Sequence, residues 1–416
     1  MKKRRWIILA GVTVLCGGLL WALLVREPIQ EGRCRLRLRE NPDLAPITHL
    51  VSQTLLPLPS QPSDIKDVLP EIRRPSFFYL TAGGREIPLA VDFSGNLKMC
   101  LDVDADGRLS DERCYPAQLV KGLEERVTFR NKFGPLSLAL GHGEQQGTVR
   151  FCILSYRRDN PGQLWVYPSH YRTGRLSLRG KVYAVAVIDG DYDGLYKTLL
   201  SLPLDPFPQT RCDVLAIDLN GNGRFDGFGP DGEISPLTAM VVVDGRYYAA
   251  HVAENGETLE LAAVEPPEGH LVVDSPNASL DLKLWSDAAN QVLSPKTNGW
   301  SLPVGRYRAV SATLHLYDPN GDDWVLPMRP NSRALRSFEI QPDHVTQLRA
   351  GPPFVLSTSV EKGHADTLII NPTLRGCAGE EYLFNFARNG VRSSERTFEI
   401  VNEKGTVLVA DKFQYG

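Results

Sequence analysis

The stretch Val182-Tyr-Ala-Val-Ala-Val-Ile188 runs directly into Asp189-Gly-Asp-Tyr-Asp-Gly194, and this change of pattern decides the fold. The first part is β-branched and apolar, which favours a strand. The second part is rich in Asp and Gly, which favours a tight loop. The same change recurs where Asp213-Val-Leu-Ala-Ile217 precedes Asp218. We therefore expect strands that end in acidic loops.

Strand and turn patterns continue from Phe77 to the end of the chain, without long amphipathic helices or βαβ alternation. The 30 Pro and 36 Gly among 416 residues suit short strands joined by many turns. The expected fold is all-β, with several small β-sandwich-like domains in tandem. The expected units are a β domain at 76–150, a second at 151–264, a β-sandwich module at 265–349 and a C-terminal immunoglobulin-like sandwich at 350–416.

The N-terminus predicts an anchor. Four basic residues at 2–5 precede twenty uncharged residues, Trp6 to Val25. Twenty helical residues span about 30 Å, the thickness of the hydrocarbon layer. Basic residues remain on the cytoplasmic side, so the bulk of the chain is expected to be exported, to the periplasm or cell surface. We favour an uncleaved transmembrane helix at 1–25 over a cleaved signal, followed by a Pro-rich linker at 26–75.

Three loops place oxygen-bearing side chains at alternate positions before a glycine, as hard cations require. Loop one is residues 102–111, loop two 189–194 and loop three 218–226. We number each loop from its first aspartate as position 1. Side-chain ligands are expected at positions 1, 3 and 5, a glycine at 6, a carbonyl ligand at 7 and an oxygen ligand at 9. The candidate ligands are Asp102, Asp104, Asp106, Arg108 (carbonyl), Ser110, Asp111, Asp189, Asp191, Asp193, Asp218, Asn220, Asn222, Arg224 (carbonyl) and Asp226.

The carboxylate of position 12 is missing from all three loops. Asp111 or Glu112 has to replace it in loop one, and Asp231 or Glu233 in loop three. Loop two carries Lys197 at position 9 and no acid soon after, so we expect it to be the weakest cation site. Asp, Asn and Gly are also ordinary turn residues, and plain turns remain the alternative reading of each loop.

The loops resemble the calcium loops of the EF-hand and dockerin families, although strands rather than helices flank them. This resemblance implies Ca²⁺ as the bound ion and covers only the loops. The stretch Leu302-Pro-Val-Gly-Arg-Tyr307 resembles an edge of transthyretin-like exported β modules, and 350–416 resembles an immunoglobulin-like sandwich.

The cysteines and the net charge restrict the possible functions further. Cys100 and Cys114 bracket loop one, where export permits a disulfide; two small buried thiols are the alternative. The net charge of −3 with mixed signs gives no basic field, so we expect no nucleic-acid partner. No catalytic motif is present.

The sequence predicts a membrane-anchored, calcium-binding scaffold or binding module with a protein or polysaccharide ligand at the envelope. The alternative is a calcium-stabilised hydrolase of polysaccharide or peptide.

Overall fold

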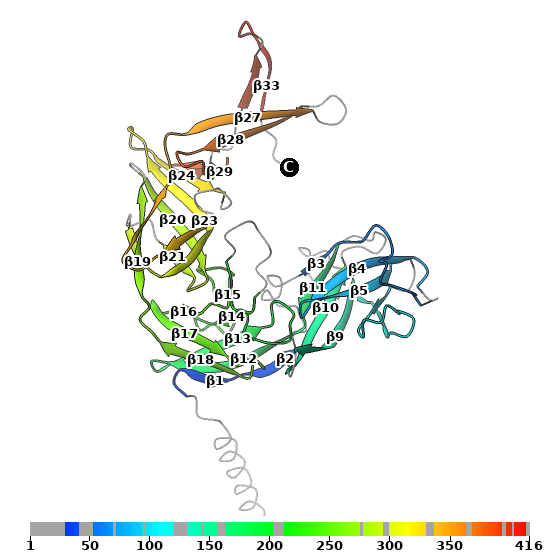
Figure 1. Ribbon diagram of the computed structural model, residues 1–416. Coiled ribbons are helices and arrows are strands. Elements are labelled where there is room, and N and C mark those ends of the chain that lie inside the picture. Colours follow the sequence, from blue (N-terminus) through cyan, green and yellow to red (C-terminus); the bar gives the residue numbers. More distant parts are fainter. Residues whose placement is uncertain are drawn as a thin grey trace, which may run out of the picture.

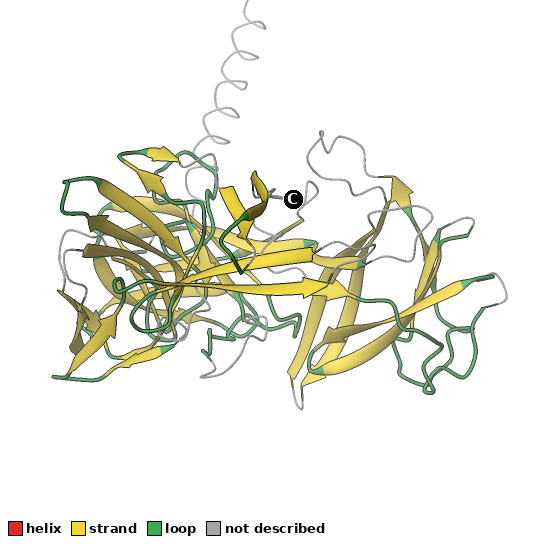
Figure 2. Cartoon of the chain, turned by 90° about the horizontal axis from the view of Figure 1, so that it is seen from above, coloured by secondary structure: helices red, strands yellow, loops and turns green. Residues whose placement is uncertain are grey.

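The computed structural model is all-β, and its described residues contain no helix (Figure 2). It describes residues 30–40, 53–69, 72–94, 97–119, 131–142, 145–155, 163–202, 212–274, 278–293, 299–329, 337–362, 368–392, 397–401 and 403–412. The predicted transmembrane segment at 1–25 lies outside these residues. Within them, no helix is long and apolar enough to cross a bilayer.

The first sheet pair packs two antiparallel sheets around one core (Figure 1). One sheet has the order β4 (Pro75–Ala82), β5 (Arg85–Asp92), β6 (Lys98–Leu101) and β7 (Cys114–Pro116). The other has the order β3 (Gln53–Leu55), β11 (Leu164–Pro168), β10 (Gln145–Ser155), β9 (Asn131–His142) and β8 (Gln118–Leu119). Phe78, Leu89 and Phe151 are buried between them. Burying each such side chain contributes about 1.5–3 kcal/mol.

The second sheet pair is built in the same way. Its first sheet has the order β2 (Arg37–Glu40), β12 (His170–Leu178), β13 (Lys181–Ile188), β14 (Val214–Ile217) and β15 (Ile234–Pro236). Its second sheet has the order β1 (Arg33–Arg35), β18 (Thr258–Ala263), β17 (Arg246–Val252) and β16 (Met240–Val243). Leu176, Tyr183 and Leu259 belong to its core. Strands β1, β2 and β3 lie within the region predicted as a linker.

One sheet of the first pair and one sheet of the second share the same local order of strands and loops. Strands β4 to β7 and strands β12 to β15 each run as a hairpin, a strand that ends in an acidic loop, and a short edge strand. The first residue of the loop is held alike in both sheets. The amide of Asp102 donates to the carbonyl of Pro88 at 3.0 Å, and the amide of Asp218 donates to that of Ala184 at 3.0 Å. Loops one and three therefore occupy equivalent places.

The third sheet pair follows along the arc that the chain makes in Figure 1. It packs β19 (Glu268–Asp274), β22 (Gly299–Pro303) and β26 (Val345–Arg349) on a larger sheet. That sheet contains β21 (Gln291–Leu293), β20 (Ala278–Ser286), β23 (Gly305–Tyr317), β24 (Asp323–Met328), β25 (Phe338–Ile340), β29 (Glu381–Tyr382), β28 (Leu368–Arg375), β27 (Val355–Lys362), β30 (Ala387–Arg388) and β31 (Val391–Arg392).

The C-terminal region continues the third sheet pair. Strand β29 pairs with β24, and Tyr382 belongs to the core shared with Leu282 and Leu314. Strands β27 and β28 extend from it as a ribbon, and all residues of β27 are exposed. A separate hairpin joins β32 (Thr397–Val401) and β33 (Val407–Lys412). The predicted boundary at 349/350 therefore separates segments that share a sheet, and the one at 150/151 falls within β10.

Candidate metal centre

The three acidic loops share one backbone conformation. In each loop a carboxylate oxygen of the first residue accepts the amide of the glycine five residues later, at 3.0, 3.0 and 2.9 Å. The glycines are Gly107, Gly194 and Gly223, with φ angles of 82°, 81° and 80°. Only glycine adopts such angles without steric cost, which explains its place in the motif.

A second set of hydrogen bonds also recurs in the three loops. The amide at position 7 donates to the side-chain oxygen at position 5 in every loop. These pairs are Arg108 to Asp106 at 2.7 Å, Leu195 to Asp193 at 2.7 Å and Arg224 to Asn222 at 2.8 Å. The loops are thus organised by their own side chains. Oxygens that these bonds leave over can serve a cation.

The group of carboxylates at loop two includes Asp213, which was not among the predicted ligands, and does not include Asp193. Because Ile188 of β13 pairs with Val214 of β14, the residues beyond them, Asp189 and Asp213, come side by side. Carboxylate oxygens of Asp189, Asp191 and Asp213 lie within 4.8 Å of one another. Asp189 is 7% exposed and Asp213 is 0% exposed. Register between strands, not spacing along the chain, assembles this group.

Burial and mutual repulsion disfavour the charged forms of this group. Burial, and then the charge of a neighbouring aspartate, raises the pKa of Asp189 and of Asp213 well above the ordinary value. Burial also raises the pKa of Asp191, with Asp193 the next cause. The Oδ1 atom of Asp191 is buried and has no hydrogen-bond partner. Such an arrangement is costly unless a cation balances it.

Lys197, the reason for expecting weak cation binding in loop two, does not contact the carboxylates of this group. Its ammonium group pairs with the carboxylate of Glu254 at the exposed surface. In the described part of the chain, no basic side chain pairs with Asp189, Asp191 or Asp213. When the carboxyls of this cluster are ionised, no basic side chain of the described residues balances their charge.

Loop one forms the second group of three carboxylates. Oxygens of Asp102, Asp104 and Asp106 lie within 4.8 Å of one another, and Asp102 is 2% exposed. Burial raises the pKa of Asp102, and its Oδ1 atom has no hydrogen-bond partner. Glu112, one of the two proposed substitutes for position 12, turns into the loop. Its Oε1 accepts the amide of Val103 at 2.6 Å.

The surroundings of loop one fix it in place. A disulfide joins Cys100 and Cys114 and closes the loop at its base, as the first of the two alternatives predicted. A segment from the predicted linker covers the other side. The amide of Lys66 donates to the carbonyl of Gly107 at 2.7 Å. The amide of Ser110, a candidate ligand, donates to Oδ1 of Asp67 at 3.3 Å.

Loop three is more exposed and carries less charge. Asn220, Asn222 and Asp226 are exposed, and the amide group of Asn222 donates to Asp226 at 2.5 Å. Glu233 is 8% exposed and accepts the amides of Asn220 and Asp226, each at 2.9 Å. Asp231, the other proposed substitute for position 12, pairs with Lys283 instead. Loop three thus keeps the backbone of the motif with fewer carboxylates.

A fourth acidic turn shows how the chain neutralises such a group internally. Oδ1 of Asp318 accepts the amides of Asn320 and Asp322, at 2.8 and 3.0 Å. The guanidinium of Arg388 pairs with Asp322. Its hydrogen bond lowers the pKa of Asp322, whereas the carboxyls of loop two have raised pKa values. The group of Asp189, Asp191 and Asp213 in loop two has no such ion pair among the described residues, whereas in loop one Arg108 pairs with Asp106 at 3.9 Å.

The raised pKa values predict how pH affects the metal-free protein. Between the ordinary value near 3.8 and the raised values of Asp189, Asp191 and Asp213, the folded state binds more protons than the unfolded chain. The contribution of these carboxyls to the stability of the folded state is therefore present at low pH, and it is lost as pH rises through their folded-state pKa values. With a chelator present, we expect the unfolding temperature to rise when pH is lowered from 8 to about 5.

Calcium should suppress that rise, because it holds the same carboxyls ionised. Burial lowers the pKa of His170, which opposes the trend. His170 contributes equally with and without calcium, so the difference between the two conditions at each pH is the quantity to measure. A difference that does not change between pH 8 and 5 contradicts the assignment.

No family model, curated protein or solved structure matches this chain.

Proposed function

We propose that this chain is an exported, membrane-anchored binding or scaffolding protein stabilised by calcium. In this proposal, the β-sandwich-like sheet pairs stand behind an N-terminal transmembrane helix. The observation that carries the calcium proposal is the group of Asp189, Asp191 and Asp213, whose carboxylate oxygens lie within 4.8 Å of one another and two of whose members are buried. A fully buried carboxylate without a cation costs several kcal/mol.

The chemistry of the donors favours a hard cation. All three side chains offer oxygen, which suits calcium, magnesium or manganese rather than zinc or copper. Calcium tolerates irregular shells of carboxylates and carbonyls, whereas magnesium needs near-ideal octahedral geometry. Loops that supply several acids, with a backbone carbonyl expected at position 7, therefore suit calcium better.

A structural role follows from where loop two lies. The hydroxyl of Tyr192 donates to the carbonyl of Val166 at 2.9 Å, and the amide of Gly83 donates to the carbonyl of Tyr192 at 2.8 Å. Tyr192 is buried in the core of the first sheet pair, although loop two belongs to the second. An ion that rigidifies this loop would hold the two sheet pairs together. The buried position fits this role better than the hydrolase alternative, whose carboxylates must reach substrate.

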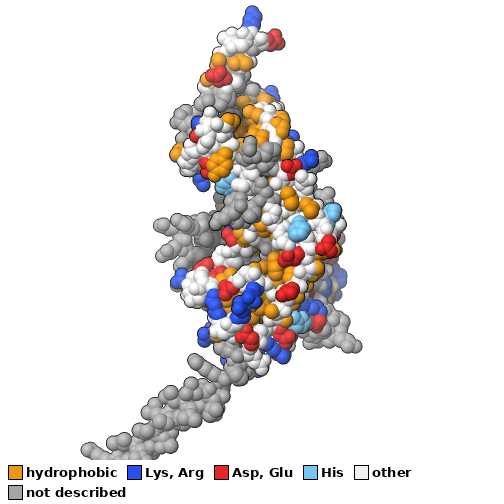
Figure 3. All heavy atoms as spheres, turned by 90° about the vertical axis from the view of Figure 1, so that its left-hand side faces the viewer, with side chains coloured by type: hydrophobic (Ala, Val, Ile, Leu, Met, Phe, Trp, Pro, Cys, Tyr) orange, Lys and Arg blue, Asp and Glu red, His pale blue; other side chains and the backbone are white. Residues whose placement is uncertain are grey.

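Two further observations support export and binding. The disulfide of Cys100 and Cys114 suits an oxidising compartment. On the face drawn in Figure 3, acidic and basic side chains are interspersed, which suits a protein or polysaccharide partner better than a polyanion. The exposed ribbon of β27 and β28 offers a surface for such a partner.

Calorimetric titration of the full chain in detergent tests the ion. We expect saturable binding of calcium, weaker binding of magnesium, and loss of the tightest site in Asp213→Ala. Glu265→Gln, which removes one exposed carboxylate, is the matched control and should bind as the wild type does. Absence of calcium binding, or equal effects of both substitutions, contradicts the proposal. A reporter fused after Gly416 should be active only outside the cytoplasm.

A further inference from the structure

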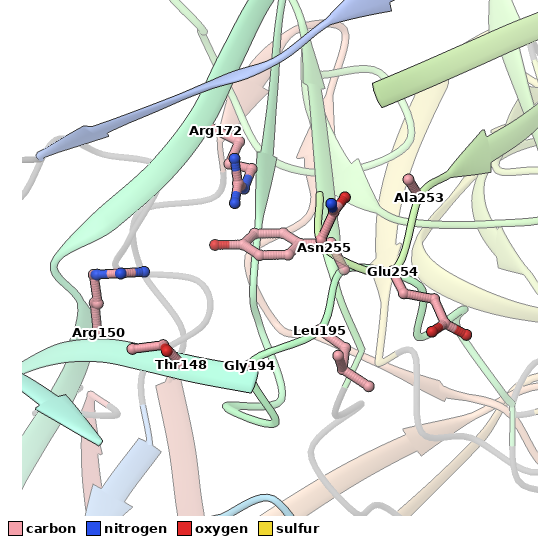
Figure 4. Close-up of a pocket in the computed structure, with 9 residues that line it drawn as sticks. Thr148, Arg150, Arg172, Gly194, Leu195, Ala253, Glu254 and Asn255 are labelled. Carbon is pink, nitrogen blue, oxygen red and sulfur yellow. The ribbon is translucent and has the colours of Figure 1, made fainter. Parts of the chain in front are cut away.

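A cavity of ≈ 560 Å³ lies where loop two meets the first sheet pair. It is lined from four directions: Thr148 and Arg150 of β10, Arg172 of β12, Gly194 to Tyr196, and Ala253 to Asn255 (Figure 4). Its volume is in the range of sites for small molecules. It does not include the carboxylates of the candidate metal centre.

Two arginines from different sheets point into this cavity (Figure 4). Arg150 lies on the face of β10 opposite its buried neighbours Val149 and Phe151. The Nε atom of Arg172 is buried and has no hydrogen-bond partner, and the guanidinium lies 5.5 Å from the ring centre of Tyr196. Within the described residues, neither arginine forms an ion pair with an acid of the chain.

The one acidic residue of the lining is neutralised. Glu254 pairs with Lys197, and Figure 4 shows its carboxylate turned away from both arginines. The remaining lining is neutral, including the side chains of Thr148 and Asn255. Two guanidinium groups beside neutral hydrogen-bonding groups form a site with a positive charge that the lining does not balance.

We propose that this cavity binds a small molecule through an anionic oxygen group, held between Arg150 and Arg172. The planar fork of arginine matches a carboxylate, phosphate or sulfate through paired hydrogen bonds. A ligand of this class would also satisfy the buried Nε of Arg172. The volume leaves room for a body of the size of a sugar acid beyond the anionic group. This proposal does not depend on calcium in loop two.

Titration of the full chain with glucuronate, inorganic phosphate and sulfate tests this proposal, in calcium and in chelator. We expect saturable binding of at least one of them, and the most effective probe identifies the anionic group. Arg150→Gln and Arg172→Gln should each weaken binding by at least about tenfold, because each removes charge-assisted hydrogen bonds. Arg150→Lys, which keeps the charge but loses the fork, should weaken it less.

Arg175→Gln is the matched control, since Arg175 lies on the same strand as Arg172 but is exposed on the opposite face. It should bind as the wild type does. If Arg172→Gln does not fold, Arg150→Gln decides the question alone. The proposal is overturned if no probe binds saturably, if the two glutamine variants bind normally, or if Arg175→Gln weakens binding equally.

Discussion

Replacing Asp189 by alanine is expected to remove the largest share of the calcium-dependent stability of this protein. The carboxylate of Asp189 belongs to the buried group of loop two and also accepts the amides of Asp193 and Gly194, at 3.2 and 3.0 Å. At ten times the dissociation constant, one site adds about 1.4 kcal/mol to the free energy of unfolding. Loss of the two backbone hydrogen bonds costs about 1–3 kcal/mol more, with or without calcium.

Thermal unfolding in calcium and in chelator separates these two effects. Asp218→Ala makes the equivalent change in loop three, where the neighbouring groups are exposed amides, and should lose less of the calcium-dependent part. Glu265→Gln should lose none. If calcium raises the unfolding temperature of Asp189→Ala as much as that of the wild type, loop two does not hold the ion.

The glycines at position 6 of the loops give the second large effect. Gly107 and Gly223 have φ angles of 82° and 80°, so alanine is strained at both. That strain costs about 1–2 kcal/mol. A Cβ atom at Gly223 meets nothing within 4 Å, whereas one at Gly107 meets the carbonyl oxygen of Asp64 at 2.2 Å. Backbone cannot yield cheaply, so we expect Gly107→Ala to cost about 2–5 kcal/mol in total.

The matched pair isolates the effect of packing. Chemical denaturation of Gly107→Ala and Gly223→Ala, both in chelator, should give a clearly larger loss for Gly107→Ala. Gly194→Ala should show a large loss of stability like that of Gly107→Ala, because its Cβ would meet the amide nitrogen of Thr148 at 2.8 Å. Equal losses at all three positions would show that the segment around Asp64 does not cover loop one.

Local chemistry allowed the sequence to predict much of this structure. Alternation and β-branching predicted the strands around loops two and three, and the all-β fold is confirmed. The glycine positions followed from the turn that the loop requires. The pairing of Cys100 with Cys114 was one of two open alternatives, and the structure contains the disulfide.

Contacts between segments that lie far apart in the chain could not be predicted from the sequence. Asp213 joins Asp189 only through the register of β13 and β14, and it precedes a strand like many other residues. Lys197 stands at ligand position 9 and therefore predicted a weak cation site, but its ammonium group pairs with Glu254, 57 residues away. For these reasons the order expected from the sequence, with loop two weakest, differs from the order that burial favours.

The substitution Asp191→Asn tests the central claim, that loop two is built to hold a cation. Asp191 Oδ1 is buried and has no hydrogen-bond partner, and oxygens of Asp189 and Asp213 lie within 4.8 Å of a carboxylate oxygen of Asp191. An amide there removes one charge and offers N–H donors to the remaining carboxylates. In chelator at pH 8, the variant should therefore unfold at a higher temperature than the wild type. In excess calcium the order should reverse, because the variant binds the ion less tightly. A variant that is less stable in both conditions, with the same response to calcium as the wild type, would contradict the account.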